Sequence, residues 1–301
     1  MTSDRSPTTA EPDYRALICA EELRRILSRD NLRVVDCRFD LMDPGAGRRS
    51  YVDEHIPGAA FLDLDEDLSA PVGPDTGRHP MPAASALANA LGRAGIDESM
   101  QVVLYDAGDG ALAARAWWLL RWAGHERAAI LDGGLARWND LGMPLVAGEE
   151  VIVASDFVIR PRPELVVDTG EVVASVASGA GLALVDARDE ARFRGESEPI
   201  DTVAGHIPGA LNLPFSRTLR ADGTWRSPKE LRKLWSAVLG EDAGSELTVM
   251  CGSGVTACHL VLSAMLAGYR EPRVYVGSWS EWIRDPARPV ARGAAGAAES
   301  A

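Results

Sequence analysis

LALVDAR at residues 182–188 repeats LRVVDCR at residues 32–38, and three further pairs follow it in the same order. EHIPGAAFLDL of the first copy matches GHIPGALNLPF of the second, VVLYDAGDGALAAR matches TVMCGSGVTACHL, and ILDGGLARW matches VYVGSWSEW. The offset between the copies is nearly constant. Two copies of this length indicate duplicated domains rather than a solenoid of short units.

Within each copy, short apolar runs rich in β-branched residues alternate with helical stretches. We expect buried parallel strands at 32–36, 102–106, 182–186, 247–251 and 273–277. We expect helices at 21–27, 114–124, 229–239 and 257–268. This alternation predicts the α/β class, with an open, mostly parallel sheet covered by helices on both faces. In such folds, ligands bind beyond the carboxyl ends of the strands.

The repeat also divides the chain. We expect an N-terminal domain at 13–141, a proline-containing linker at 142–165, and a C-terminal domain at 166–290. The polar start of the chain, residues 1–12, and its end, residues 291–301, are expected to be disordered.

Composition excludes several partners. The 301 residues carry a formal net charge of −13, which argues against nucleic acid or an anionic membrane, since both bind basic surfaces. The sequence shows neither a signal peptide nor a membrane span, so we expect a cytoplasmic protein. The cysteines do not have the spacing of a zinc site or a disulfide framework, so no metal is expected: Cys19, Cys37, Cys251 and Cys258.

Cys251 directly follows the apolar run that ends at Met250. The Gly-Ser-Gly sequence after it can turn tightly and expose backbone N–H groups, and a helix is expected from Val255 or Thr256. Amide groups and a helix N-terminus both stabilise a thiolate. The alternative, a buried structural cysteine, is less consistent with two glycines at a strand-to-helix junction.

CGSGVTA, the doubled HIPGA motif, VDAR and the terminal GSWSEW together resemble the two-domain rhodanese family of sulfurtransferases, and the loop is most similar to that of 3-mercaptopyruvate sulfurtransferases. The resemblance implies tandem rhodanese-like domains and no cofactor. It implies that Cys251 takes sulfur from a small donor as a persulfide and passes it to a thiophilic acceptor, such as cyanide, a small thiol or a thioredoxin-like protein. Loop residues would bind the donor and the persulfide through their amides: Gly252, Gly254, Val255 and Thr256.

Two other functions compete with this interpretation. Cysteine phosphatases that share the fold need an arginine at the position of Ala257, so phosphoryl transfer is disfavoured. A relay protein that hands its persulfide to a partner is also consistent with Cys251, but such a carrier does not need a cleft built by a second domain.

The residues after the cysteine bear on the donor. Thiosulfate-type members carry basic residues there, whereas Gly252 and Ser253 are uncharged. This favours 3-mercaptopyruvate and leaves thiosulfate as the alternative. In mercaptopyruvate-type relatives a Ser–His–Asp set is proposed to assist the reaction, and the matching residues are Ser253, His79 and Asp65. Because two of them belong to the first domain, we expect the site between the domains.

The resemblance further implies that Arg192, in ARFRG, pairs with the donor carboxylate, since a guanidinium binds a carboxylate through two hydrogen bonds. Arg188 is the other arginine that we expect to bind substrate. Relatives usually carry another arginine soon afterwards, where this chain has Ile200, so one anchor of the donor is missing.

Asp106 stands where the first copy would have its cysteine. A carboxylate cannot form a persulfide, so we expect the first domain to be catalytically inert. Residues that both copies share are expected to support the fold: Asp36, Asp186, His55 and His206.

Overall fold

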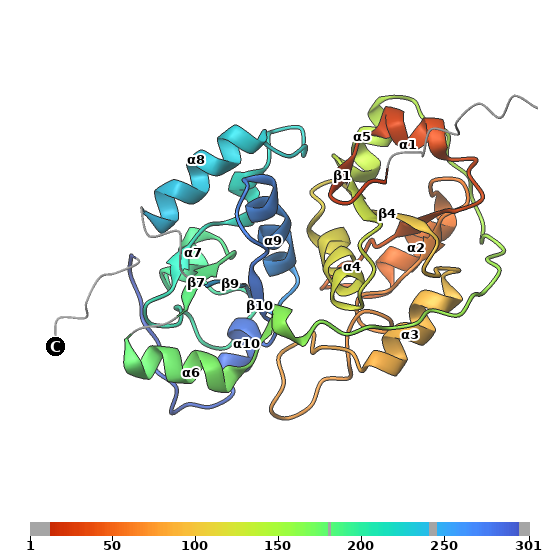
Figure 1. Ribbon diagram of the computed structural model, residues 1–301. Helices are drawn as coiled ribbons and strands as arrows, with labels where there is room; N and C mark the ends of the chain where they lie inside the picture. The colour runs from red at the N-terminus through yellow and green to blue at the C-terminus, as the bar shows by residue number, and fades with distance from the viewer. Residues whose placement is uncertain (1–12, 180–181, 241–245, 295–301) are drawn as a thin grey trace, which may run out of the picture.

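A computed structural model describes residues 13–179, 182–240 and 246–294. These residues form two five-stranded sheets with the orders β1-β5-β4-β2-β3 and β6-β10-β9-β7-β8, and every pair of neighbouring strands is parallel. The two sheets lie in separate halves of the molecule (Figure 1). The expected tandem α/β architecture is therefore confirmed. The ends expected to be disordered, 1–12 and 295–301, lie outside the described residues.

The first domain contains β1 (Leu17–Ile18), α1 (Ala20–Ile26), β2 (Leu32–Asp36), α2 (Ala46–Asp53), β3 (Ala60–Phe61), α3 (Ala84–Arg93), β4 (Gln101–Tyr105), α4 (Ala111–Trp122), β5 (Ala128–Leu131) and α5 (Gly134–Asp140). The second contains β6 (Val166–Val167), α6 (Thr169–Ser178), β7 (Ala183–Asp186), α7 (Glu190–Phe193), β8 (Leu211–Asn212), α8 (Pro228–Leu239), β9 (Leu247–Met250), α9 (Thr256–Leu266), β10 (Arg273–Tyr275) and α10 (Ser278–Trp282). Short 3-10 helices lie at Pro163–Leu165 and Phe215–Thr218.

Helices cover both faces of each sheet. Side chains of α1, α2 and α5 form one core with the first sheet, and those of α6, α7 and α10 form the equivalent core with the second. A third and larger core contains residues of α3 and α4 from the first domain and of α8 and α9 from the second. Figure 1 shows α4 and α9 facing each other between the domains, where they pack together. One hydrophobic core therefore joins the two copies.

The segment 142–165, expected to be a linker, runs along the first domain before it enters the second (green in Figure 1). Its backbone is held there by hydrogen bonds, such as those from Ser155 N–H to Gly92 O (3.0 Å) and from Arg160 N–H to Ala123 O (2.9 Å). None of the helices in the described part of the chain is long and apolar enough to cross a membrane.

The shared motifs hold the strand ends in both copies. Asp186 accepts a hydrogen bond from the backbone N–H of Arg188 (3.0 Å) and pairs with its guanidinium (2.7 Å). Asp36 and Arg38 have the same geometry in the first copy. His206 stacks on Phe193 with ring centroids 3.7 Å apart. These pairs support the fold, as expected for the shared aspartates and histidines.

Two expectations are wrong. The Arg188 side chain is only 1% exposed, and besides Asp186 it donates to Gly205 O (2.8 Å) and lies over the ring of Trp279. Its guanidinium is therefore held by groups of the fold and is not open to a substrate in this structure. Residues 291–294 are not disordered, because Ala291 exchanges backbone hydrogen bonds of 2.9 Å with His206.

The loop that follows β4 and begins at Asp106 is the first domain's counterpart of the loop that carries Cys251, and we call it the silent loop. The carboxylate of Asp106 itself occupies this loop. The buried Asp106 carboxylate accepts four backbone N–H bonds of 2.9–3.1 Å, from Gly108, Gly110, Leu112 and Ala113. These amides surround the start of α4, where anions are favoured. The first copy thus keeps the amide-lined loop and occupies it with a fixed carboxylate.

We predict that Asp106→Ala lowers the free energy of unfolding by about 3 kcal/mol, because buried N–H groups lose their acceptor. Urea unfolding would measure this loss. Replacement of the exposed Asp75 by alanine is the control, and its cost should stay below about 0.5 kcal/mol. Equal stability of the Asp106 variant and the wild type would contradict this account of the loop.

Candidate active site between the two domains

Cys251 lies directly after β9, and its side chain is buried. Gly254 donates its N–H to the Cys251 sulfur (3.1 Å), and the N–H of Cys251 donates to Ser278 Oγ (3.1 Å). Gly254 has φ +77°, and a Cβ there would lie 2.4 Å from Val276 O, so only glycine fits this turn. The turn places the sulfur before the N-terminus of α9, as the sequence predicted.

The first residues of α9 follow immediately. Val255 is the N-cap and Thr256 the first helical residue. Amides at this end of a helix have no acceptor within the helix. They are therefore available to an anion beside Cys251, which is the role expected for Val255 and Thr256.

Ser278 is a residue that the sequence analysis missed. It has φ +54°, the only positive φ among the described residues other than glycine, and the equivalent position in the first copy is Gly134 (φ +55°). A serine in this left-handed conformation costs on the order of 1 kcal/mol. Its hydroxyl accepts from Cys251 N–H and donates to Tyr275 O (2.8 Å). This strain therefore accompanies a contact that fixes the Cys251 backbone.

Ser253, His79 and Asp65 come together across the domain boundary. Ser253 Oγ lies 2.7 Å from His79 Nδ1, and His79 Nε2 lies 3.4 Å from Asp65 Oδ1. The carboxylate opposite Nε2 favours a proton on that nitrogen, so Nδ1 accepts a hydrogen bond from the Ser253 hydroxyl. The geometry expected for these three residues is present, although Asp65 itself is exposed.

The electrostatics keep His79 neutral. Burial lowers its pKa to about 3, with further contributions from the nearby Arg115 and Arg78. At neutral pH the ring therefore acts as a hydrogen-bond acceptor for Ser253 and carries no charge.

Two guanidinium groups lie over Gly252. A Cβ on this glycine would be 2.9 Å from Arg78 Nη2 and 3.6 Å from Arg192 Nη2. Arg192 also pairs with Glu198 (2.8 Å) and Asp201 (3.1 Å). Arg192 thus lies beside residues 251–255, the loop that carries Cys251 and that we call the cysteine loop. No motif indicated Arg78, because it belongs to the other domain.

Arg115 of α4 is a second arginine that the sequence did not indicate. It is fully buried, and within the described ranges no carboxylate is paired with it. Its guanidinium donates to Gly254 O (3.3 Å) and to His79 O (3.4 Å). Arg115 therefore links the loop of Cys251 to the loop of His79 and places a positive charge beneath both.

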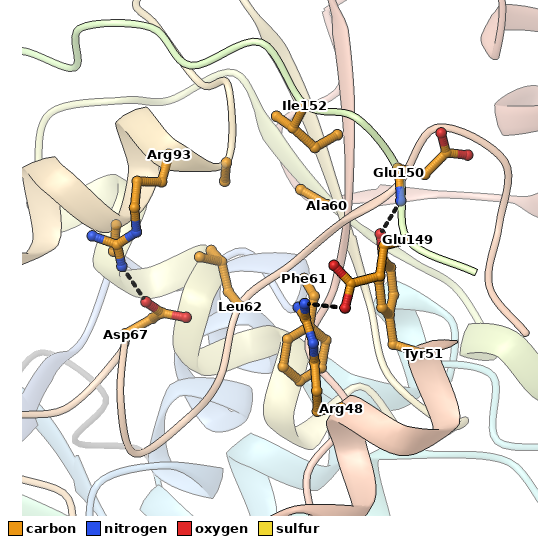
Figure 2. A pocket seen from close by; sticks show the side chains of 12 residues that line it. Arg48, Tyr51, Ala60, Phe61, Leu62, Asp67, Arg93, Glu149, Glu150 and Ile152 are labelled. Carbon is orange, nitrogen blue, oxygen red and sulfur yellow. Dashed lines mark hydrogen bonds and ion pairs between the residues drawn. The ribbon is translucent and has the colours of Figure 1, made fainter. Parts of the chain in front are cut away.

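A cavity of about 150 Å³ lies in the first domain, apart from the residues described above (Figure 2). Its two arginines are already paired, Arg48 with Glu149 (2.8 Å) and Arg93 with Asp67 (2.7 Å). None of the expected site residues lines it. Within the described ranges, no group of three or more histidine, cysteine, aspartate or glutamate side chains is arranged to hold a metal ion.

Comparison with known proteins identifies the family of the chain. The rhodanese-like domain matches twice, at residues 20–141 and 169–285. A protein of Pseudomonas aeruginosa named "Probable 3-mercaptopyruvate sulfurtransferase" is 50% identical over 92% of this chain and 98% of its own length. The thiosulfate sulfurtransferase of Rattus norvegicus is 33% identical over 95% of this chain and 98% of its own.

Among solved structures, the 3-mercaptopyruvate sulfurtransferase from Leishmania major superposes with a TM-score of 0.80 at 29% identity, covering 92% of this chain and 77% of that one. The chain therefore belongs to the two-domain rhodanese family of sulfurtransferases.

The neutral state of His79 predicts a pH dependence of stability. As the pH falls below about 6.5, the unfolded chain binds a proton at this histidine while the folded protein does not, so stability is lost between about pH 6.5 and pH 3. We expect His79→Asn to remove about 1 kcal/mol of the loss between pH 7.5 and pH 5.5. Urea unfolding at the two pH values measures it, and an unchanged loss would contradict a depressed pKa.

Proposed function

We propose that this protein transfers sulfur from 3-mercaptopyruvate to a thiophilic acceptor through a persulfide on Cys251. The observation that carries the proposal is the Ser253–His79 contact of 2.7 Å beside the cysteine loop. A hydroxyl held in this way suits a donor whose carbon leaving group must gain a proton. The names of the Pseudomonas aeruginosa and Leishmania major relatives support the same donor, whereas the Rattus norvegicus relative is named for thiosulfate.

In the first half-reaction, the Cys251 thiolate attacks the donor sulfur. A sulfur–sulfur bond forms, the carbon–sulfur bond breaks, and its electron pair stays on the methylene carbon as the enolate of pyruvate. The methylene carbon takes a proton from the Ser253 hydroxyl and becomes a methyl group, the donor thiol returns a proton to Ser253, and the persulfide is left as an anion. Ser253, oriented by neutral His79 and Asp65, is the group that we assign to this proton delivery.

The loop stabilises the negative charge throughout. The N–H of Gly254 already donates to the sulfur at 3.1 Å, and the first amides of α9 are available for the outer sulfur. Arg192 is the residue that we assign to the donor carboxylate, because its guanidinium lies beside Gly252.

In the second half-reaction, an acceptor such as cyanide or a thiol attacks the outer sulfur and releases the Cys251 thiolate. Cyanide becomes thiocyanate, with no net oxidation. A small thiol or a thioredoxin-like protein are the physiological acceptors that we propose. We place the reaction in the cytoplasm, where the four cysteines, all free here, stay reduced.

Thiosulfate is the second candidate donor. The two guanidinium groups over Gly252 supply the positive charge that the loop itself lacks. A dianion could use them. Its leaving group, sulfite, needs no proton, and this difference separates the two donors experimentally.

We predict that Ser253→Ala lowers kcat with 3-mercaptopyruvate about 100-fold, because proton delivery to carbon is lost. With thiosulfate the same variant should stay within about threefold of the wild type. Thiocyanate formation from cyanide measures both. If the wild type uses thiosulfate with the higher kcat/KM, or if the variant loses both activities equally, the proposed donor is wrong.

Cys251→Ser should abolish transfer from either donor, since a hydroxyl cannot form the persulfide. Cys258→Ser is the matched control. Cys258 is fully buried in α9, and burial raises the pKa of its thiol to about 12. Mass spectrometry after incubation with donor alone should find the added sulfur on Cys251. Sulfur on Cys258, or turnover by the Cys251 variant, would contradict the mechanism.

A further inference from the structure

Arg78 belongs to a loop of the first domain that is anchored on the second. Its backbone N–H donates to Ser280 Oγ (3.0 Å), and Arg284 donates to Thr76 O (3.0 Å). A Cβ on Gly77 would lie 2.6 Å from Gly277 O, so the backbones meet there without room for a side chain. The contacts fix the backbone of Arg78 relative to the catalytic domain.

The guanidinium of Arg78 lies at the residue that follows the nucleophile. Its Nη2 atom is the nearest atom to the Cβ position of Gly252, closer than either terminal nitrogen of Arg192. The two arginines come from different domains, yet both border this one glycine. A side chain at Gly252 would displace Arg78.

Asp201 connects the two arginines. One carboxylate oxygen pairs with Arg78 Nη1, and the other lies 3.1 Å from Arg192 Nη2. The Asp201 side chain is only 4% exposed, so it holds both cations in place. Arg78 Nε is buried and has no hydrogen-bond partner among the described residues. Arg78 therefore retains donor capacity that the protein does not use.

Other arginines do not supply this capacity. The guanidinium of Arg188 already pairs with Asp186 and donates to Gly205 O. Arg194 is exposed and pairs with Glu196 (2.8 Å) and Glu190 (3.4 Å). Ile200, where relatives carry an arginine, is itself exposed and precedes Asp201.

We propose that Arg78 is the second guanidinium of the donor site, contributed by the catalytically silent domain in place of the arginine missing at Ile200. This inference rests on the proposed function, because it concerns the carboxylate of the same donor. Arg192 and Arg78 flank that carboxylate from the two domains. Donor specificity thus depends on Arg192, which lies near the VDAR motif, and on Arg78, which lies outside every motif of the catalytic domain.

The test compares Arg78→Gln with the wild type in the thiocyanate assay. Losing a hydrogen bond to a charged group should raise KM for 3-mercaptopyruvate about 10-fold to 100-fold, while kcat changes less than about threefold. Arg194→Gln is the matched control and should leave both constants unchanged. Unchanged KM in the Arg78 variant would overturn the proposal.

A donor without the carboxylate separates binding from a structural effect. With the methyl ester of 3-mercaptopyruvate, the wild type and Arg78→Gln should have the same KM, because the group that Arg78 binds is already gone. A variant that loses acid and ester turnover by equal factors would show a structural role and overturn the proposal.

The two hypotheses fail in different ways. A wild type that transfers no sulfur from 3-mercaptopyruvate overturns the proposed function, and the assignment of Arg78 with it. A wild type that uses this donor, with an unchanged KM in the Arg78 variant, overturns the assignment of Arg78 alone.

Discussion

The packing of α4 against α9 joins two α/β domains into one core, and the candidate site depends on this contact. Side chains of both helices belong to the same buried cluster. With the domains fixed in this way, the loop of the first domain that carries Arg78 and His79 reaches the loop of Cys251. Without the packing, His79 would have no Ser253 to contact, and Arg115 of α4 would be an exposed cation.

The duplication also explains why the two halves cover each other. The loop at residues 70–80 of the first domain lies on the cysteine loop. In return, Trp225 of the second domain donates its backbone N–H to Asp132 Oδ1 (2.9 Å) at the end of β5. Gly223 approaches Gly108 of the silent loop. Each domain thus closes the carboxyl end of the other's sheet, but only one of the closed loops carries sulfur. In the other, the carboxylate of Asp106 occupies the amides, although burial raises its pKa to about 6.

The sequence predicted the parts of the molecule that are local in the chain. The strand runs, the helix after Cys251, the structural aspartates and the duplication all follow from short patterns, because buried parallel strands and tight turns restrict residue type nearby. Ser253, His79 and Asp65 came from the resemblance, and in the structure their side chains lie next to one another.

Residues that act across the boundary could not be predicted in the same way. Arg78 and Arg115 approach the loop from the other domain, so no spacing within the catalytic copy indicates them. Arg188 was misread for the complementary reason. Its position next to Arg192 suggested a shared role, whereas burial pairs it with Asp186 two residues earlier. Because Arg188 is close to Arg192 in sequence, its access to the site was overestimated. Because Arg78 is far from Cys251 in sequence, its position beside the site was not predicted.

The catalytically inert first domain contributes a buried charge to the site. A buried cation is costly unless an anion offsets it, yet Arg115 has no carboxylate partner among the described residues. Its guanidinium donates to backbone oxygens of both domains, including those of Gly254 and His79. The same arginine helps to keep His79 uncharged. One buried residue of the inert copy therefore contacts the loop of Cys251 and helps to keep His79 neutral, so the geometry and the charge of the second domain's site both depend on the first domain.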